Sequence, residues 1–200
     1  VVLVPVKQAP LPDYSSDYAG LHSGEVGEIS VSGPMVTAGY DRMPGATCDA
    51  RFKIGNLVYH RMGDLGYFDG AKNLRFLGRK VECVQSQAGP IETERCEPAI
   101  AQLAGVKRCA LIGIGKPPCQ EPCLVIEPDR SFVRKAGEVI LRKEILLTAR
   151  RMFPEYNISR VIFERKMPVD ARHNAKIHRL SLSKKWTPRV LKKPALGKLQ

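Results

Sequence analysis

The stretch Tyr59-His60-Arg61-Met62-Gly63-Asp64-Leu65-Gly66-Tyr67 decides the fold of the first part of the chain, because strand-like segments lie on either side of it. One such segment, residues 56–60, overlaps the start of the stretch. The other, residues 66–70, overlaps its end and runs into a turn. Residues 74–78 return from that turn, which predicts a hairpin. Further upstream, residues 28–32 alternate polar and apolar side chains, as a half-buried strand does. The sequence therefore predicts a β-rich region up to about residue 80.

The pattern changes after residue 80 to alternating helices and strands. Residues 138–152 carry an apolar stripe with basic residues largely outside it, which predicts an amphipathic helix. We also expect a helix over 95–104, a short helix that ends near Trp186, and the strands 108–114, 122–127 and 160–163. The predicted class is α+β. The predicted divisions are a β piece (1–80), a small α+β domain (81–186) and a basic tail (187–200).

Composition excludes some classes of function. The 200 residues hold 32 Lys and Arg against 20 Asp and Glu, and residues 160–200 hold 12 basic and two acidic residues. Trp186 is the only aromatic residue after Phe163, so nothing indicates the stacking surface of a single-strand nucleic-acid binder. No apolar run is long enough for a transmembrane segment. The six cysteines lack metal-site spacing, so we expect free thiols, no metal site and a reducing, cytoplasmic location.

Three ordered motifs and one late lysine carry a family resemblance. The motifs are Gly24-Glu25-Val26-Gly27-Glu28-Ile29-Ser30-Val31-Ser32-Gly33, the stretch from Tyr59 to Tyr67, and Leu77-Gly78-Arg79-Lys80. In this order, with Lys176 in a late loop, they resemble the C-terminal third of the adenylate-forming superfamily, which includes acyl-CoA synthetases and peptide-synthetase adenylation domains. The resemblance implies a distorted barrel-like β subdomain that ends a large N-terminal domain, followed by a small α+β lid domain.

The resemblance also implies a site that uses ATP. Asp64 matches the carboxylate that accepts hydrogen bonds from the ribose hydroxyls, and Arg79 matches the arginine that donates to ribose or phosphate. Tyr67 is assigned with them to cofactor binding. Lys176 matches the mobile lysine of the carboxylate–phosphate junction, where a long stem with a point charge is suitable. Taken alone, Asp64 is an ordinary turn residue, and Arg79 and Lys176 are ordinary surface charges.

The late loop Met167-Pro168-Val169-Asp170-Ala171-Arg172-His173-Asn174-Ala175-Lys176-Ile177 resembles that of the olefin β-lactone synthetases. These enzymes adenylate a 2-alkyl-3-hydroxy fatty acid, whose own hydroxyl then displaces AMP without CoA. His173 is a candidate catalytic base for that hydroxyl, since its pKa lies near operating pH. The alternative is that His173 and Asn174 only shape the loop that holds Lys176. An acyl-CoA synthetase with CoA as co-substrate, or a peptide-synthetase-like adenylation enzyme, is the second interpretation of function.

The sequence departs from the family in two places. Val81 stands where the family has an Asp or Lys hinge, and Lys80 or Glu82 is a possible substitute. The family's phosphate loop, its magnesium-binding Glu and its acyl pocket are expected upstream, so the isolated fragment is expected to be inactive. Thiolase-like and reductase-like pathway partners are expected by analogy alone. A basic, non-catalytic binding module is the interpretation from another class.

Overall fold

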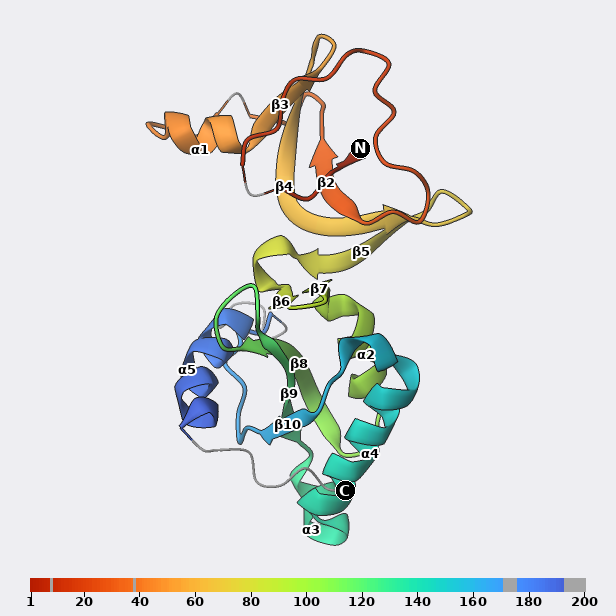
Figure 1. The fold of residues 1–200 in the computed structure, drawn as a ribbon, viewed down its shortest axis with the longest axis vertical. Coiled ribbons are helices and arrows are strands. Elements are labelled where there is room, and N and C mark those ends of the chain that lie inside the picture. The colour runs from red at the N-terminus through yellow and green to blue at the C-terminus, as the bar shows by residue number, and fades with distance from the viewer. Residues whose placement is uncertain (8, 38, 171–175, 193–200) are drawn as a thin grey trace. The chain divides into compact units, whose positions relative to one another are not determined.

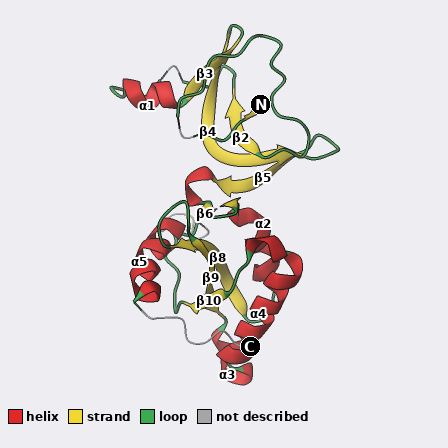
Figure 2. Cartoon of the chain, viewed as in Figure 1, coloured by secondary structure: helices red, strands yellow, loops and turns green. Residues whose placement is uncertain are grey.

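The computed structural model describes residues 1–7, 9–37, 39–170 and 176–192. The chain forms two compact units, Val1–Val81 and Glu82–Gln200 (Figure 1). The first unit is mainly strand, and the second mixes helices with strands, as Figure 2 shows. The predicted mixed fold class is therefore confirmed.

The first unit is built on one curled antiparallel sheet. Its strands follow the order β1-β2-β4-β3, and β5 pairs with β4. The elements are β1 (Val2–Val4), β2 (Gly27–Val31), α1 (Pro44–Asp49), β3 (Arg51–Ile54), β4 (Leu57–Phe68) and β5 (Leu74–Arg79). The β4–β5 hairpin confirms the predicted one. The two strand segments expected around residues 59–67 are one continuous strand, and α1 was not predicted.

The core of the first unit is small and partly aromatic. It consists of Val2, Val4, Leu11, Phe52 and Ile54. Tyr14, Tyr18 and Tyr59 pack against it. The rings of Tyr14 and Tyr18 are stacked on each other, and the ring of Tyr59 is stacked on that of Phe52. The alternation along residues 28–32 predicted one exposed face, and this was wrong: Glu28 is 1% exposed and Ser30 is fully buried. Strand β2 is buried on both faces over residues 27–30, and the Glu28 carboxylate is compensated there by Arg61 and Lys80.

The described residues of the second unit form a three-stranded sheet, a two-stranded ribbon and four α-helices. In the larger sheet β9 lies between β8, its antiparallel partner, and β10, its parallel partner. The 3₁₀ helix η1 (Lys80–Glu82) crosses the boundary between the units. The remaining elements are β6 (Val84–Ser86), β7 (Gly89–Ile91), α2 (Thr93–Ala101), β8 (Val106–Ile114), β9 (Glu121–Pro128), α3 (Arg130–Ala136), α4 (Glu138–Met152), η2 (Pro154–Tyr156), β10 (Arg160–Phe163) and α5 (Arg179–Leu191).

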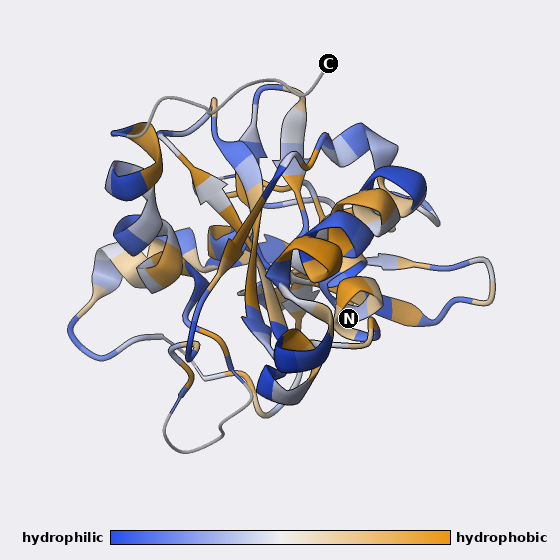
Figure 3. Ribbon diagram, turned by 90° about the horizontal axis from the view of Figure 1, so that it is seen from below, coloured by the Kyte–Doolittle hydropathy of each residue, from blue (hydrophilic) through white to orange (hydrophobic). Residues whose placement is uncertain are grey.

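Strand alternation divides the core of this unit between the two faces of the sheet. One face of β8 and β9 packs against α2 and α4, for example through Leu111 and Ile126. The other face packs against α5, through Ile112, Val125 and Leu182. Figure 1 shows α5 on one side of the sheet and α2 and α4 on the other, and Figure 3 shows hydrophilic and hydrophobic residues alternating around the helices. Each fully buried Leu or Ile contributes about 1.5–3 kcal/mol.

The strongest patterns gave accurate boundaries. Helix α4 and strand β10 have the predicted limits, and α4 buries Leu141, Ile145 and Ala149. Helix α2 starts and ends earlier than predicted, and the short strand β7 was not predicted. Helix α5 continues to Leu191, past the predicted end near Trp186, so the predicted tail from residue 187 begins inside a helix.

Candidate functional site

Asp64 and Arg79 face each other across the β4–β5 pair. They are register partners, and Asp64 Oδ1 lies 3.0 Å from Arg79 Nε. The Asp64 side chain is 23% exposed and the Arg79 side chain 47%, while Asp64 Oδ1, which faces Arg79, is buried. A carboxylate next to a guanidinium presents acceptors for hydroxyl groups beside donors for a phosphate. The structure thus brings together two of the residues that the sequence placed in one site.

Local backbone irregularities aim this pair. The register shifts between Leu65 and Gly66, which leaves Leu77 as an extra residue in β5. Such bulges turn side chains next to functional sites. Gly63 has φ +70° and Gly78 has φ +111°, conformations that side chains other than glycine rarely adopt. A glycine with positive φ thus directly precedes each member of the pair.

A buried ion cluster beneath the pair joins the three motifs, and the sequence analysis missed it. Glu28 Oε2 accepts hydrogen bonds from Arg61 Nη2 at 2.7 Å and from Lys80 Nζ at 2.9 Å. Arg61 also donates to the carbonyls of Ala9 and Asp49. Glu28, Arg61 and Lys80 come one from each motif. The usable signal was that each motif carries a charged residue besides those assigned to the nucleotide.

His60 and Tyr67 flank Asp64 along β4. Burial, with a contribution from Arg51, lowers the pKa of His60, whose ring centroid lies 6.0 Å from that of Tyr40. Tyr67 is partly buried and pairs in register with Arg75. Successive strand residues point to opposite faces, so Tyr67 is turned away from the face of Asp64. Nucleotide contact by Tyr67 stays a prediction.

Lys176 belongs to the second unit and is exposed. The backbone around it is held on both sides, because the Asp170 amide donates to the Lys176 carbonyl and the His178 amide donates to the Pro168 carbonyl, each at 2.9 Å. Ile177 is buried in the core under α5. The base of the loop is therefore fixed, and it presents an exposed lysine. His173 lies outside the described residues.

Arg179, three residues after Lys176, anchors this segment to three carboxylates. Its guanidinium donates to Glu82 at 2.8 Å, to Glu94 at 3.2 Å, and to Glu97 at 2.7 and 2.5 Å. Burial raises the pKa of Glu97, although Arg179 and the Leu111 amide oppose that shift. The hydrogen bonds and charges of the three glutamates raise the pKa of Arg179 despite its burial. The first turn of α5 is thus fixed to α2 and to the residue after Val81.

In the described part of the chain, no group of three or more His, Cys, Asp or Glu side chains is placed to hold a metal ion. None of the helices described is both long and apolar enough to cross a bilayer. All six cysteines are free thiols, and four of them are buried, as the sequence predicted.

Comparison with known sequences identifies relatives, although no protein-family model matches the chain. The chain is 38% identical over 200 residues to an olefin β-lactone synthetase of Stenotrophomonas maltophilia, covering 98% of this chain and 35% of that protein. It is 27% identical over 166 residues to a long-chain-fatty-acid–CoA ligase of Salmonella typhimurium, covering 82% of this chain and 28% of that protein. The chain spans about a third of the length of these curated relatives.

Solved structures share the fold. ATP-bound MatB from Rhodopseudomonas palustris superposes with a TM-score of 0.70 at 23% identity, covering 89% of this chain and 33% of that one. The amide bond synthetase McbA from Marinactinospora thermotolerans gives a TM-score of 0.68 at 23% identity, covering 87% and 34%. Together with the sequence relatives, these matches show that the chain belongs to the adenylate-forming superfamily and represents a C-terminal portion of its enzymes.

Proposed function

We propose that this chain is part of an ATP-dependent, AMP-forming ligase that activates a fatty-acid-type carboxylate. The observation that carries the proposal is the partly exposed Asp64–Arg79 pair at the bulge between β4 and β5. In this proposal residues 1–80 end a large N-terminal domain, and residues 81–186 form its lid. The remaining binding groups, including a magnesium ligand, lie upstream, and the isolated chain is inactive.

In the first half-reaction each of these residues has a distinct task. Asp64 accepts hydrogen bonds from the ribose hydroxyls, and Arg79 donates to ribose or phosphate. The substrate carboxylate oxygen attacks the α-phosphorus of ATP, and pyrophosphate leaves. Lys176 donates to the developing negative charge where carboxylate and phosphate join, a type of stabilisation that is worth several kcal/mol in buried sites, on the order of 2.7–4 per donor.

In the second half-reaction the substrate is a 2-alkyl-3-hydroxy acid, and its own hydroxyl is the nucleophile. The hydroxyl oxygen bonds to the acyl carbon, the bond from that carbon to the AMP oxygen breaks, and His173 takes the hydroxyl proton. The product is a four-membered β-lactone with AMP as leaving group. A tethered nucleophile needs no CoA and gains from proximity. The relative from Stenotrophomonas maltophilia, an olefin β-lactone synthetase, supports this substrate class.

The chemistry of the proposed substrate indicates which classes of enzyme would make it. A thiolase-like enzyme would join two acyl chains, and a reductase-like enzyme would convert the resulting ketone to the 3-hydroxyl. We include both as pathway partners in the proposal, with a cytoplasmic location that suits six free cysteines.

The second candidate is an acyl-CoA ligase, in which a thiol of CoA displaces AMP. The match to a long-chain-fatty-acid–CoA ligase over 82% of the chain favours it, at lower identity. The two candidates share the first half-reaction and differ in the second, so a requirement for CoA distinguishes them.

The decisive experiment uses the full-length enzyme that contains this chain, with ATP, magnesium and a 2-alkyl-3-hydroxy fatty acid. Products are analysed by mass spectrometry with and without CoA. We expect AMP and a product one water lighter than the acid, without CoA. Lys176→Ala should lose AMP formation. Lys184→Ala, which removes another exposed lysine of the second unit, is the matched control and should keep it.

Four results would redirect the proposal. A thioester that forms only with CoA would establish the acyl-CoA ligase. Full AMP formation by Lys176→Ala would remove Lys176 from the site. If His173→Ala still forms the adenylate but no longer closes the lactone, the role of His173 as the base is supported. If this variant closes the lactone at an unchanged rate, that role is refuted. Absence of AMP under all conditions would contradict the ligase proposal and favour a basic, non-catalytic module.

A further inference from the structure

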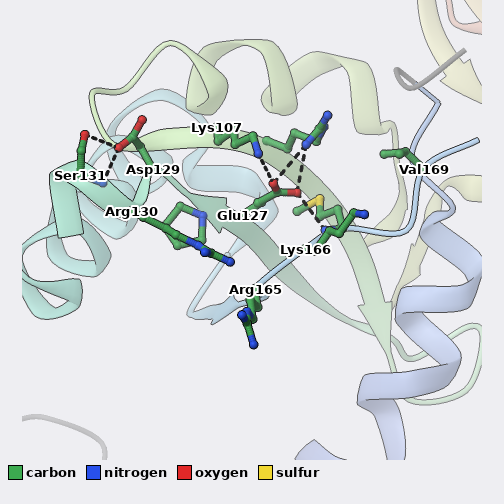
Figure 4. A pocket seen from close by; sticks show the side chains of 11 residues that line it. Lys107, Glu127, Asp129, Arg130, Ser131, Arg165, Lys166 and Val169 are labelled. Carbon is green, nitrogen blue, oxygen red and sulfur yellow. Dashed lines mark hydrogen bonds and ion pairs between the residues drawn. The ribbon is translucent and has the colours of Figure 1, made fainter. Parts of the chain in front are cut away.

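A basic pocket of about 600 Å³ opens in the second unit where β9 and β10 end (Figure 4). It is distinct from Asp64 and Arg79, which belong to the first unit. Its walls come from the start of β8, the turn that leads into α3, and the segment after β10. Five cationic side chains line it, against two carboxylates: Lys107, Arg108, Arg130, Arg165 and Lys166.

Glu127 forms the floor of the pocket and is fully engaged. It is 3% exposed, and its carboxylate contacts Lys107 Nζ at 2.7 Å and Arg108 Nη1 at 3.1 Å. The backbone amide of Met167 donates to it at 2.9 Å. Burial raises the pKa of Glu127, but these donors outweigh burial and hold the pKa below its ordinary value. Glu127 therefore stays charged. Its single negative charge is shared by the two strand cations, Lys107 and Arg108, and does not reach the cations of the rim.

The second carboxylate is engaged as well. Asp129 Oδ1 accepts from the amide of Ser131 at 2.7 Å and from that of Phe132 at 3.1 Å, as an N-cap of α3. Among the residues that the structure describes, it forms no ion pair with Arg130, its neighbour in sequence. Both acids of the pocket are thus committed to local partners.

Arg130, Arg165 and Lys166 remain as uncompensated charges on the rim. All three side chains are exposed, and none of them forms an ion pair or a hydrogen bond with another described side chain or backbone group. Figure 4 shows them coming from the segments after β9 and β10, around one opening. Arg130 and Arg165 also line an adjoining hollow of about 490 Å³, together with Arg134 and the carboxylates of Glu138 and Glu164. Glu164 is itself paired with Lys185. Like charges gathered in a concave site raise the local concentration of anions.

We propose that this pocket binds a ligand that carries adjacent phosphate groups. Arginine presents a planar fork of donors that matches phosphate, and a lysine beside it adds a point charge. Three cations exceed what a single phosphate needs, and the volume lies in the range of about 300–1,000 Å³ that small-molecule sites occupy. Inorganic pyrophosphate and a nucleoside triphosphate are two sources of this chemistry. The proposal is independent of the ligase activity, because it invokes none of the residues assigned to it.

The test measures binding to the 200-residue chain at physiological ionic strength. Isothermal titration calorimetry and ¹⁵N chemical-shift mapping would use pyrophosphate, orthophosphate and ATP as probes. The variants are Arg165→Gln with Lys166→Gln, and separately Arg130→Gln. Lys143→Gln with Lys184→Gln is the matched control, because it removes two exposed positive charges from α4 and α5. Thermal unfolding checks that every variant is folded.

We expect saturable pyrophosphate binding, with shifts at residues 107–108, 127–131 and 165–166. The pocket variants should weaken it by about tenfold or more, as expected for lost charge-assisted hydrogen bonds, and the control should not. If ATP binds more tightly than pyrophosphate and causes the same chemical-shift changes, the ligand is a nucleotide. If pyrophosphate binds as tightly as ATP or more tightly, the ligand is inorganic. The proposal is overturned if pyrophosphate does not saturate, if orthophosphate binds as tightly, if the control weakens equally, or if the shifts lie around Asp64 and Arg79.

Discussion

Replacing Arg179 with Met removes the cation shared by Glu82, Glu94 and Glu97. The Arg179 side chain is 12% exposed, and the three carboxylate side chains are 11%, 32% and 8% exposed. Removing one partner of a buried ion pair leaves an uncompensated charge, which costs about 3–5 kcal/mol. A typical domain has only about 5–15 kcal/mol of stability. We therefore expect Arg179→Met to remove a large part of the stability of the second unit.

The assay is denaturant unfolding followed by the fluorescence of Trp186, the single tryptophan, which lies on α5. The pH dependence tests the cause. Burial raises the pKa of Glu97 above its ordinary value of 4.5, and losing Arg179 raises it further. A carboxyl whose pKa is raised in the folded state contributes to stability when it is protonated. This contribution to stability is lost as the pH rises through the folded-state pKa. The deficit of Arg179→Met should therefore shrink as the pH falls below neutral.

Two variants make this prediction sharp. Lys184→Met removes an exposed positive charge from the same helix and should change stability by no more than about 0.5 kcal/mol. Arg179→Lys keeps the charge but loses the fork geometry and should fall between the wild type and Arg179→Met. The reasoning is refuted if Arg179→Met is as stable as Lys184→Met at neutral pH. It is also refuted if the deficit does not shrink in acid.

Three further outcomes can be measured directly. In the full-length enzyme, Asp64→Asn should lower kcat/KM for adenylation, measured by ATP–pyrophosphate exchange, by about 10–100-fold, since one charged hydrogen bond is worth about 1.5–3 kcal/mol. Gly105→Ala should lower the unfolding free energy by about 1–3 kcal/mol, because φ is +90° and the added Cβ would lie 2.4 Å from Phe132; thermal unfolding would detect this. Exposed Cys48 and Cys119 should react quickly with a thiol reagent counted by absorbance, and the four buried cysteines should react only on unfolding, since burial raises their pKa values.

Periodicity in the sequence was sufficient for much of the second unit. Helix α4 has one apolar stripe and a proline, Pro154, just beyond its end, so local sequence and tertiary packing agree. Helix α5 was predicted too short because Pro188 suggested an end, yet the helix passes through it. Short elements such as α1 and β7 carry too few residues to show a period.

The candidate site was predictable where motif residues are neighbours in the sheet. Asp64 and Arg79 meet because the predicted hairpin pairs their strands. The burial of Glu28 was not predictable from alternation, because β2 is covered on both faces and its charge is compensated by Arg61 and Lys80 from distant segments. A pairing of this kind depends on tertiary structure, which a local pattern does not contain.

The link between the two units has a mechanical consequence. Val81 is 63% exposed, while Lys80 is tied to Glu28 within the first unit and Glu82 to Arg179 within the second. Val81 lies between these two ion-paired residues in the short 3₁₀ helix η1, and it is itself uncharged. Its backbone torsions are governed by steric preferences, not by charge. We therefore expect rotation at this joint to change when position 81 carries a bulkier or a more permissive residue. It should not depend on salt concentration or pH as long as the two ion pairs remain formed.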